Sequence, residues 1–171
     1  ASYALVTTAW EDELDELFKE ERTRIKAKNV SCEETEDELV FRTETLKLVM
    51  KKQPIQFQLY DTEGKLIYSD LKERAFDKDQ LGRITHYSEI QAETDHFYGF
   101  GEKTGHLDKK GRHLRMSPKD AIGADPEFGE PLYKHVPFYI RVNETNLHAL
   151  GLFYNNSYDA VFDMGNERSG Y

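Results

Sequence analysis

Two neighbouring carboxylates, Asp163 and Glu167, are the first residues in this chain that suggest acid–base chemistry. Hydrolysis of a glycosidic bond with retention needs two carboxyl groups about 5–5.5 Å apart that flank a pocket. Asp163 and Glu167 instead follow directly on a strand-like run, in a segment with the composition of a turn. We therefore interpret them as turn residues and predict no catalytic residue in the chain.

A second group, His106, Asp108 and His113, contains side chains that bind metals. No recognised ligand spacing is present, and the surrounding positive charge would repel a divalent cation. That charge comes from Lys109, Lys110, Arg112 and Arg115. We predict solvated loop side chains and basic residues that pair with local carboxylates or with another domain, with no metal and no cofactor.

The glycines of Gly99-Phe100-Gly101 raise the question of nucleotide binding. The dinucleotide fingerprint needs a third glycine three residues later, followed by a helix. That position is Thr104, and the residues beyond it have no helical pattern. Because Gly-Lys-Ser/Thr is also missing, a P-loop is excluded. The glycines with Glu102 and Lys103 predict a shaped polar turn after a strand.

The overall composition limits the partners and the compartment. The 171 residues have a formal net charge of −9, which disfavours nucleic acid and anionic membranes as partners. No apolar run approaches the roughly 20 residues that span a bilayer. Cys32 is the only cysteine, so an internal disulfide is excluded. A single cysteine and no signal peptide lead us to expect a cytoplasmic protein.

The elements that position these residues are mostly strands, because apolar and polar residues alternate along much of the chain. The expected strands cover residues 38–43, 45–50, 55–60, 65–68, 83–87, 93–98, 137–142, 149–154 and 158–163. A hairpin turn is expected at residues 61–64, where Gly64 suits the left-handed position.

Two segments depart from the strand pattern. Apolar residues three and four apart from Trp10 to Phe18 predict a short helix within residues 10–28. From about Thr104 to Val136, glycines and prolines replace the alternation and predict one long functional loop. The fold class is therefore mainly β, an antiparallel β-sandwich with a short N-terminal helix and one long loop, in a single domain of residues 1–171.

The central segment reads FYGFGEKTG at residues 97–105 and LDKKGR at residues 107–112. It continues with MSPKDAIGADP at residues 116–126, PLYKHVPF at residues 131–138 and GLFYNNSY at residues 151–158. These motifs resemble the N-terminal domain of glycoside hydrolase family 31, the α-glucosidase/α-xylosidase family. The likeness covers about residues 97–165 with high specificity.

The resemblance implies a galactose mutarotase-like β-sandwich that precedes a catalytic (β/α)8 barrel. The parent enzyme would hydrolyse terminal α-linked sugars with retention, using two aspartates of that barrel. We expect this chain to be a fragment without the barrel, to brace it, and to contribute a loop to the substrate pocket. The resemblance gives Asp120 a substrate-binding role, in which its carboxylate accepts hydrogen bonds from sugar hydroxyls.

Other interpretations stay open at this point. Asp120 is also suited to a turn near Pro118, and Phe128, Tyr133 and Phe138 either pack the loop or face sugar. A self-sufficient carbohydrate-binding module would need an exposed aromatic platform. A mutarotase-like epimerase would need a paired histidine and glutamate. No such pairing is recognisable for His86, His96, His135 or His148.

Overall fold

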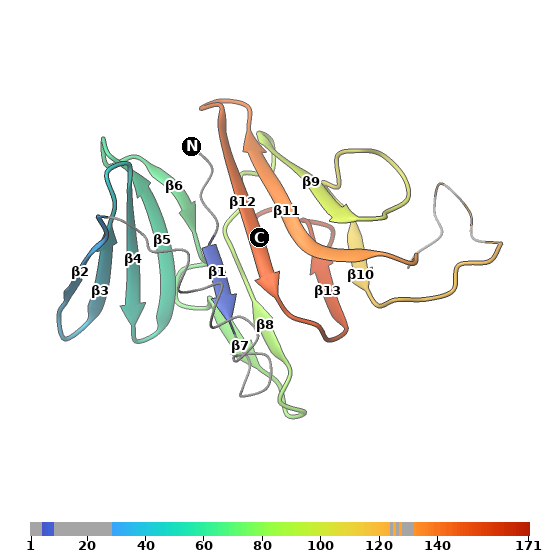
Figure 1. Ribbon diagram of the computed structural model, residues 1–171, viewed down its shortest axis with the longest axis horizontal. Helices are drawn as coiled ribbons and strands as arrows, with labels where there is room; N and C mark the ends of the chain where they lie inside the picture. Colours follow the sequence, from blue (N-terminus) through green and yellow to red (C-terminus); the bar gives the residue numbers. More distant parts are fainter. Residues whose placement is uncertain (1–4, 9–28, 124, 126, 128–131) are drawn as a thin grey trace. The chain divides into compact units, whose positions relative to one another are not determined.

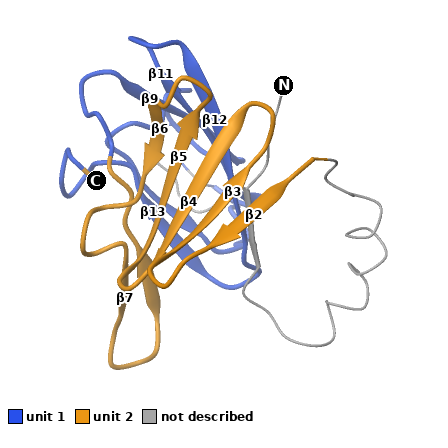
Figure 2. Ribbon diagram, turned by 90° about the vertical axis from the view of Figure 1, so that its left-hand side faces the viewer, with its two compact units in different colours: residues 1–10, 90–170 blue, residues 11–89, 171 orange. Residues whose placement is uncertain are grey.

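The computed structural model describes residues 5–8, 29–123, 125, 127 and 132–171. The chain forms two compact units (Figure 2). Unit 1 contains residues 1–10 and 90–170, and unit 2 contains residues 11–89 together with Tyr171. Two compact units are compatible with one domain of residues 1–171, so the single-domain organisation stays a prediction.

Unit 2 contains a five-stranded antiparallel sheet whose strands follow one another in chain order. Its strands are β2 (Ser31–Glu34), β3 (Glu38–Arg42), β4 (Leu46–Lys52), β5 (Ile55–Asp61) and β6 (Leu66–Ser69). A separate pair joins β7 (Phe76–Lys78) to β8 (Ile84–His86). The expected hairpin turn between β5 and β6 is present, because the N–H of Gly64 donates to the carbonyl of Asp61 at 3.2 Å.

Asp70 lies directly after β6 and is fully buried in unit 2. Its carboxylate accepts hydrogen bonds from the Phe57 N–H at 2.7 Å and from the Tyr68 hydroxyl at 2.6 Å, and His86 Nε2 lies 2.7 Å away. The ring of His86 stacks on Phe76 with centroids 4.6 Å apart. This network ties the end of the main sheet to the β7–β8 pair.

Unit 1 contains a four-stranded sheet in the order β1-β12-β11-β9 and a second pair, β10–β13 (Figure 1). The strands are β1 (Leu5–Thr8), β9 (Asp95–Gly101), β10 (His113–Met116), β11 (His135–Asn143), β12 (His148–Asn155) and β13 (Ala160–Asp163). β1 runs parallel to β12, and the other pairs are antiparallel.

The core of unit 1 lies between its two sheets. Along β11 the buried side chains are Tyr139, Arg141 and Asn143, which alternate with the exposed Ile140 as the pleat requires. The ring of Phe162 from β13 lies 6.1 Å from the Tyr139 ring. The β10–β13 pair therefore packs on the buried face of the four-stranded sheet.

The structure corrects the expected long loop in two ways. β9 continues through Gly101, so Gly99 and Gly101 belong to a strand, although a turn was predicted there. β10 also interrupts the segment from 104 to 136 and divides it into a β9–β10 loop (residues 102–112) and a β10–β11 loop (residues 117–134). The described part of the β10–β11 loop extends away from the strands of unit 1 (Figure 1).

The described residues contain strands and turns and no helix, which confirms the mainly β class. The helix expected within residues 10–28 lies outside the described residues, as does Phe128. In the part of the chain that the structure describes, no helix has the length and apolar character needed to cross a membrane.

Candidate functional site

Glu102 and Lys103, which follow β9, connect the two ends of the β10–β11 loop. The N–H of Glu102 donates to the carbonyl of Lys134 at 3.0 Å, and the N–H of Lys134 donates to the Glu102 carboxylate at 3.3 Å. The Lys103 ammonium donates to the carbonyl of Arg115 at 2.7 Å and lies 2.9 Å from His135 Nδ1. Arg115 and His135 lie at opposite ends of the loop. Glu102 and Lys103 therefore hold the two ends together, and we call this pair of residues the clamp.

The glycines before the clamp allow close approach between β9 and β11. A Cβ on Gly101 would lie 2.8 Å from the carbonyl oxygen of Lys134 and 2.9 Å from the nitrogen of Val136. A Cβ on Gly99 would lie 2.7 Å from the carbonyl oxygen of Phe138. The pairing register of β9 and β11 shifts in the same region, so the glycines accommodate an irregular crossing that side chains would block.

Asp120 is exposed and lies on the first limb of the β10–β11 loop, the part that follows β10; the second limb is the part that leads into β11. Its Oδ1 accepts a hydrogen bond from the hydroxyl of Tyr133, on the second limb, at 2.9 Å. Next to this pair the N–H of Lys119 donates to the carbonyl of Leu132 at 3.3 Å. The structure thus places the residue singled out from the sequence on a surface loop with an accessible carboxylate. Its proposed contact with sugar stays a prediction.

Two of the aromatic candidates behave differently. Tyr133 is 54% exposed and contacts Asp120. The ring of Phe138 is half-buried and lies over Gly151, within 2.9 Å of the position a Cβ would take. Phe138 therefore packs on the four-stranded sheet, whereas Tyr133 belongs to the loop surface.

The β9–β10 loop is organised around Lys109, which is buried at 5% exposure. Its ammonium donates to the carbonyl of Thr104 at 3.0 Å and to the carbonyl of His106 at 2.5 Å. Its backbone N–H donates to the carbonyl of Phe97 at 2.8 Å. Arg115, in contrast, pairs with Asp159 at 3.5 Å, the kind of contact with a local carboxylate that the sequence predicted for the basic residues.

His96 and Asp108 attach the same loop to β9. His96 Nδ1 lies 2.6 Å from the Asp108 carboxylate, and its Nε2 lies 3.5 Å from Glu144. The hydrogen bond to Asp108 raises the pKa of His96 and outweighs the opposing effect of burial. Burial by itself would raise the pKa of Asp108, but hydrogen bonds from the Phe97 N–H, His96 and the Lys110 N–H lower it overall. No local pattern in the sequence indicates this pair, because the two residues are 12 positions apart.

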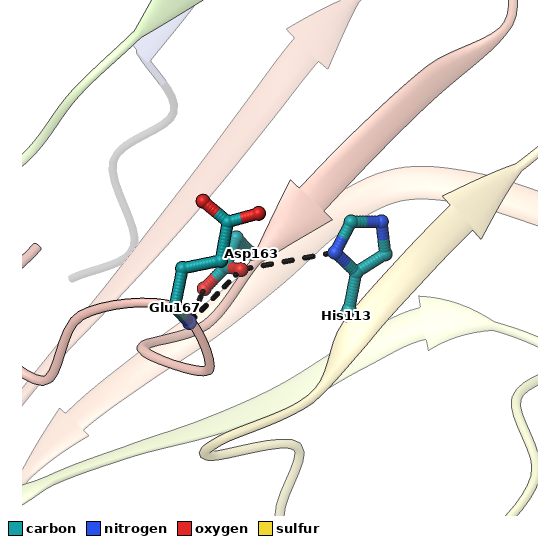
Figure 3. Close-up of side chains that lie close together, drawn as sticks. All are labelled: His113, Asp163 and Glu167. Atoms are coloured by element: carbon teal, nitrogen blue, oxygen red, sulfur yellow. Dashed lines mark hydrogen bonds and ion pairs between the residues drawn. The ribbon is translucent and has the colours of Figure 1, made fainter.

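The three residues weighed as metal ligands do not come together. Asp108 contacts His96, while His113 lies across from Asp163 in the β10–β13 pair. His113, Asp163 and Glu167 have potential ligand atoms within 4.8 Å of one another (Figure 3). His113 Nδ1 is 3.8 Å from Asp163 Oδ2.

The turn after β13 accounts for the position of Asp163. Its Oδ1 accepts hydrogen bonds from the backbone N–H groups of Gly165 at 3.0 Å and Asn166 at 2.7 Å. Both oxygens also lie within 3.4 Å of the Glu167 nitrogen (Figure 3). Asp163 is therefore an Asx-type turn residue, as the sequence predicted.

Comparisons with known proteins place these features in a family. The glycosyl hydrolase 31 N-terminal galactose mutarotase-like domain matches residues 2–163. The chain is 34% identical over 137 residues to alpha-glucosidase 2 of Bacillus thermoamyloliquefaciens. The match covers 80% of this chain and 17% of that protein, so the chain spans about one sixth of its relative's length.

Solved structures show the same relationship. A GH31 dextranase from Flavobacterium johnsoniae, complexed with isomaltotriose, superposes with a TM-score of 0.70 at 30% identity. The match covers 83% of this chain and 16% of that one. The cycloalternan-forming enzyme of Listeria monocytogenes, at a TM-score of 0.66 and 18% identity, shares the fold. The expected galactose mutarotase-like β-sandwich is thereby confirmed, and the chain belongs to the family of glycosyl hydrolase 31 N-terminal galactose mutarotase-like domains.

Proposed function

We propose that this chain is the non-catalytic N-terminal domain of an α-glucosidase-like enzyme that hydrolyses terminal α-linked sugars with retention. In that enzyme it braces the catalytic (β/α)8 barrel of the same polypeptide and contributes the β10–β11 loop to the substrate pocket. The observation that carries the proposal is the family match over residues 2–163, combined with the one sixth of a relative's length that the chain spans.

The geometry of the chain supports a role outside the bond-breaking step. The carboxylate pair suggested by the sequence, Asp163 and Glu167, is part of a turn in which Asp163 caps backbone N–H groups. A retaining mechanism needs one carboxylate free to attack and one to protonate the leaving group. In the proposed enzyme both carboxylates come from the barrel.

The ligand class follows from the relatives. The dextranase structures contain isomaltotriose or glucose. An α-glucoside or a related oligosaccharide is therefore the proposed substrate. Asp120 suits such a ligand, because an exposed carboxylate accepts short hydrogen bonds from vicinal hydroxyls.

Enzyme assays on two lengths of protein test this function. The 171-residue chain alone, purified free of host glycosidases, is expected not to cleave p-nitrophenyl α-glucoside, whereas the complete protein cleaves it. Asp120→Ala in the complete protein is expected to cost about 2–4 kcal/mol of transition-state binding. Turnover by the chain alone would overturn the non-catalytic assignment, and unchanged kinetics in Asp120→Ala would remove Asp120 from the pocket.

A self-sufficient carbohydrate-binding module is the alternative. Such a module needs an exposed aromatic platform, yet the aromatic residues Phe97, Phe100 and Tyr139 of unit 1 are buried in its core. Titration calorimetry of the chain with maltose and isomaltose separates the two functions. Binding at millimolar or lower concentration would favour the module.

A further inference from the structure

We propose that Tyr133 is a positioning residue that orients the Asp120 carboxylate for the sugar. The proposal rests on the function given above. Its starting point is the hydrogen bond from the Tyr133 hydroxyl to Asp120 Oδ1 at 2.9 Å, between residues 13 positions apart on opposite limbs of the β10–β11 loop.

The hydrogen bond leaves the carboxylate able to bind a ligand. A carboxylate has about four acceptor sites, and the tyrosine hydroxyl occupies one of them. Among the described residues, Asp120 Oδ2 accepts no hydrogen bond from the protein. The oxygen that the tyrosine does not hold therefore remains available to sugar hydroxyls.

Orientation matters because Asp120 is exposed. The terminal torsion of an aspartate is broad, so an unsupported carboxylate samples many orientations. Ordering it only when a ligand arrives reduces affinity, and ordering it beforehand avoids that cost. In the described part of the loop, the hydroxyl of Tyr133 bonds this carboxylate and so restricts its torsion in the free protein.

Tyr133 is in turn placed by backbone contacts on both sides. The carbonyl of the preceding residue, Leu132, accepts a hydrogen bond from the N–H of Lys119 at 3.3 Å. The following residue, Lys134, exchanges two hydrogen bonds with Glu102 at the base of the loop. The clamp is thus connected to Asp120 through Lys134 and Tyr133. In this proposal, residues 101–103 contribute to substrate binding by holding Tyr133 in place.

The test is a double-mutant cycle in the complete enzyme, measured as kcat and KM for p-nitrophenyl α-glucoside. Tyr133→Phe removes only the hydroxyl and is expected to lower kcat/KM about 3- to 10-fold. It should move the same constant, kcat or KM, that Asp120→Ala moves. In the Asp120→Ala background, Tyr133→Phe should have no further effect.

Tyr158→Phe is the matched control, because Tyr158 is 59% exposed and Tyr133 is 54% exposed. It should leave kcat/KM unchanged, and the thermal unfolding midpoint of Tyr133→Phe should equal that of the parent. These two results separate a specific effect from a general loss of folding.

Each other outcome has one meaning. If Asp120→Ala lowers activity and Tyr133→Phe does not, the positioning role is wrong and the proposed function stands. If Tyr133→Phe has the same effect with and without Asp120, the tyrosine acts independently and the positioning role is also wrong. If neither substitution changes the kinetics, the pocket role of the loop and the role of Tyr133 both fail.

Discussion

The two loops on either side of β10 differ in how they are held. In the β9–β10 loop a lysine is buried, and its ammonium binds two carbonyl groups of the same loop. In the β10–β11 loop the described side chains lie mostly at the surface, with Ile122 at 86% exposure. Its main described contacts are the clamp at the base and the pair of Tyr133 with Asp120.

The difference suggests two separate tasks. The β9–β10 loop is held firmly within unit 1, because Lys109 bonds carbonyl groups of the loop and Asp108 attaches the loop to His96 of β9. The β10–β11 loop presents polar and apolar groups outward, which is expected of a segment that meets a ligand or another domain. The first loop is therefore expected to govern stability, and the second to govern activity.

The largest stability effect is expected from Gly101→Ala, at the start of the clamp. The new Cβ would lie within 2.9 Å of backbone atoms of Lys134 and Val136, at a φ of +77° that disfavours alanine. We expect a loss of about 2–5 kcal/mol in the free energy of unfolding, measured by urea denaturation.

Gly123→Ala, in the β10–β11 loop, is the control. Gly123 has a φ of +74°, but among the described residues no atom beyond its chain neighbours lies within 4 Å of the new Cβ. Only the backbone preference opposes the change, so a loss of about 1 kcal/mol or less is expected. Equal losses for the two variants would contradict the close approach of β9 and β11.

The second effect concerns the buried lysine. Lys109→Met keeps the apolar stem but leaves the carbonyls of Thr104 and His106 without this donor. We expect the free energy of unfolding to fall by about 2 kcal/mol. Lys119→Met, at an exposed position of the β10–β11 loop, should change it by less than about 0.5 kcal/mol. A neutral Lys109→Met would show that the β9–β10 loop is not held in this way.

The third effect depends on pH and involves His96. The pKa of His96 is raised by Asp108, so the folded chain binds this proton more tightly than the unfolded chain does. The stabilisation is fully present below the ordinary imidazole pKa of about 6.5 and is lost as the pH rises through the higher folded value.

Two measurements check this pH effect. Two-dimensional NMR of the histidine ring should give a His96 pKa above the ordinary value, and Asp108→Asn should lower it. In urea denaturation, His96→Gln should flatten the loss of stability above a pH of about 6.5. A pKa at or below the ordinary value would rule out the His96–Asp108 pair as the attachment of this loop.

The smallest effect is expected at the surface part of the clamp. Lys134 Nζ lies 3.7 Å from the Glu102 carboxylate, and the Lys134 side chain is 81% exposed. Such ion pairs contribute little, so Lys134→Gln should change the free energy of unfolding by about 0.5 kcal/mol or less. A larger loss would mean that the ion pair, and not the backbone hydrogen bonds beside it, holds the base of the loop.

The alternation of apolar and polar residues was enough to predict most strands. The regular β4, β5, β11 and β12 were all expected within a few residues of their observed bounds. β1, β2, β7 and β10 were not expected. β2 is exposed along its whole length, and β7 has three residues, so neither has a buried face that would produce an alternating pattern.

The candidate site was predictable only in part. The motif around Asp120 identified the loop, but the partner of Asp120 came from the structure, because Tyr133 lies 13 residues away across an irregular segment. The predicted turn at Gly99 and Gly101 was wrong for a similar reason. The glycines allow β9 to lie close to β11. The local sequence around the glycines does not indicate which distant strand will lie beside them.

The sequence by itself determined the β class and the family, because these depend on local composition and on motifs that are contiguous in the chain. The tertiary structure decided which charged groups meet. Lys103 contacts His135, 32 positions away, and Asp108 contacts His96 and not His113. These contacts form because the strands of unit 1 bring distant parts of the chain side by side. The local sequence does not determine that arrangement, since it depends on how distant segments pack on one another.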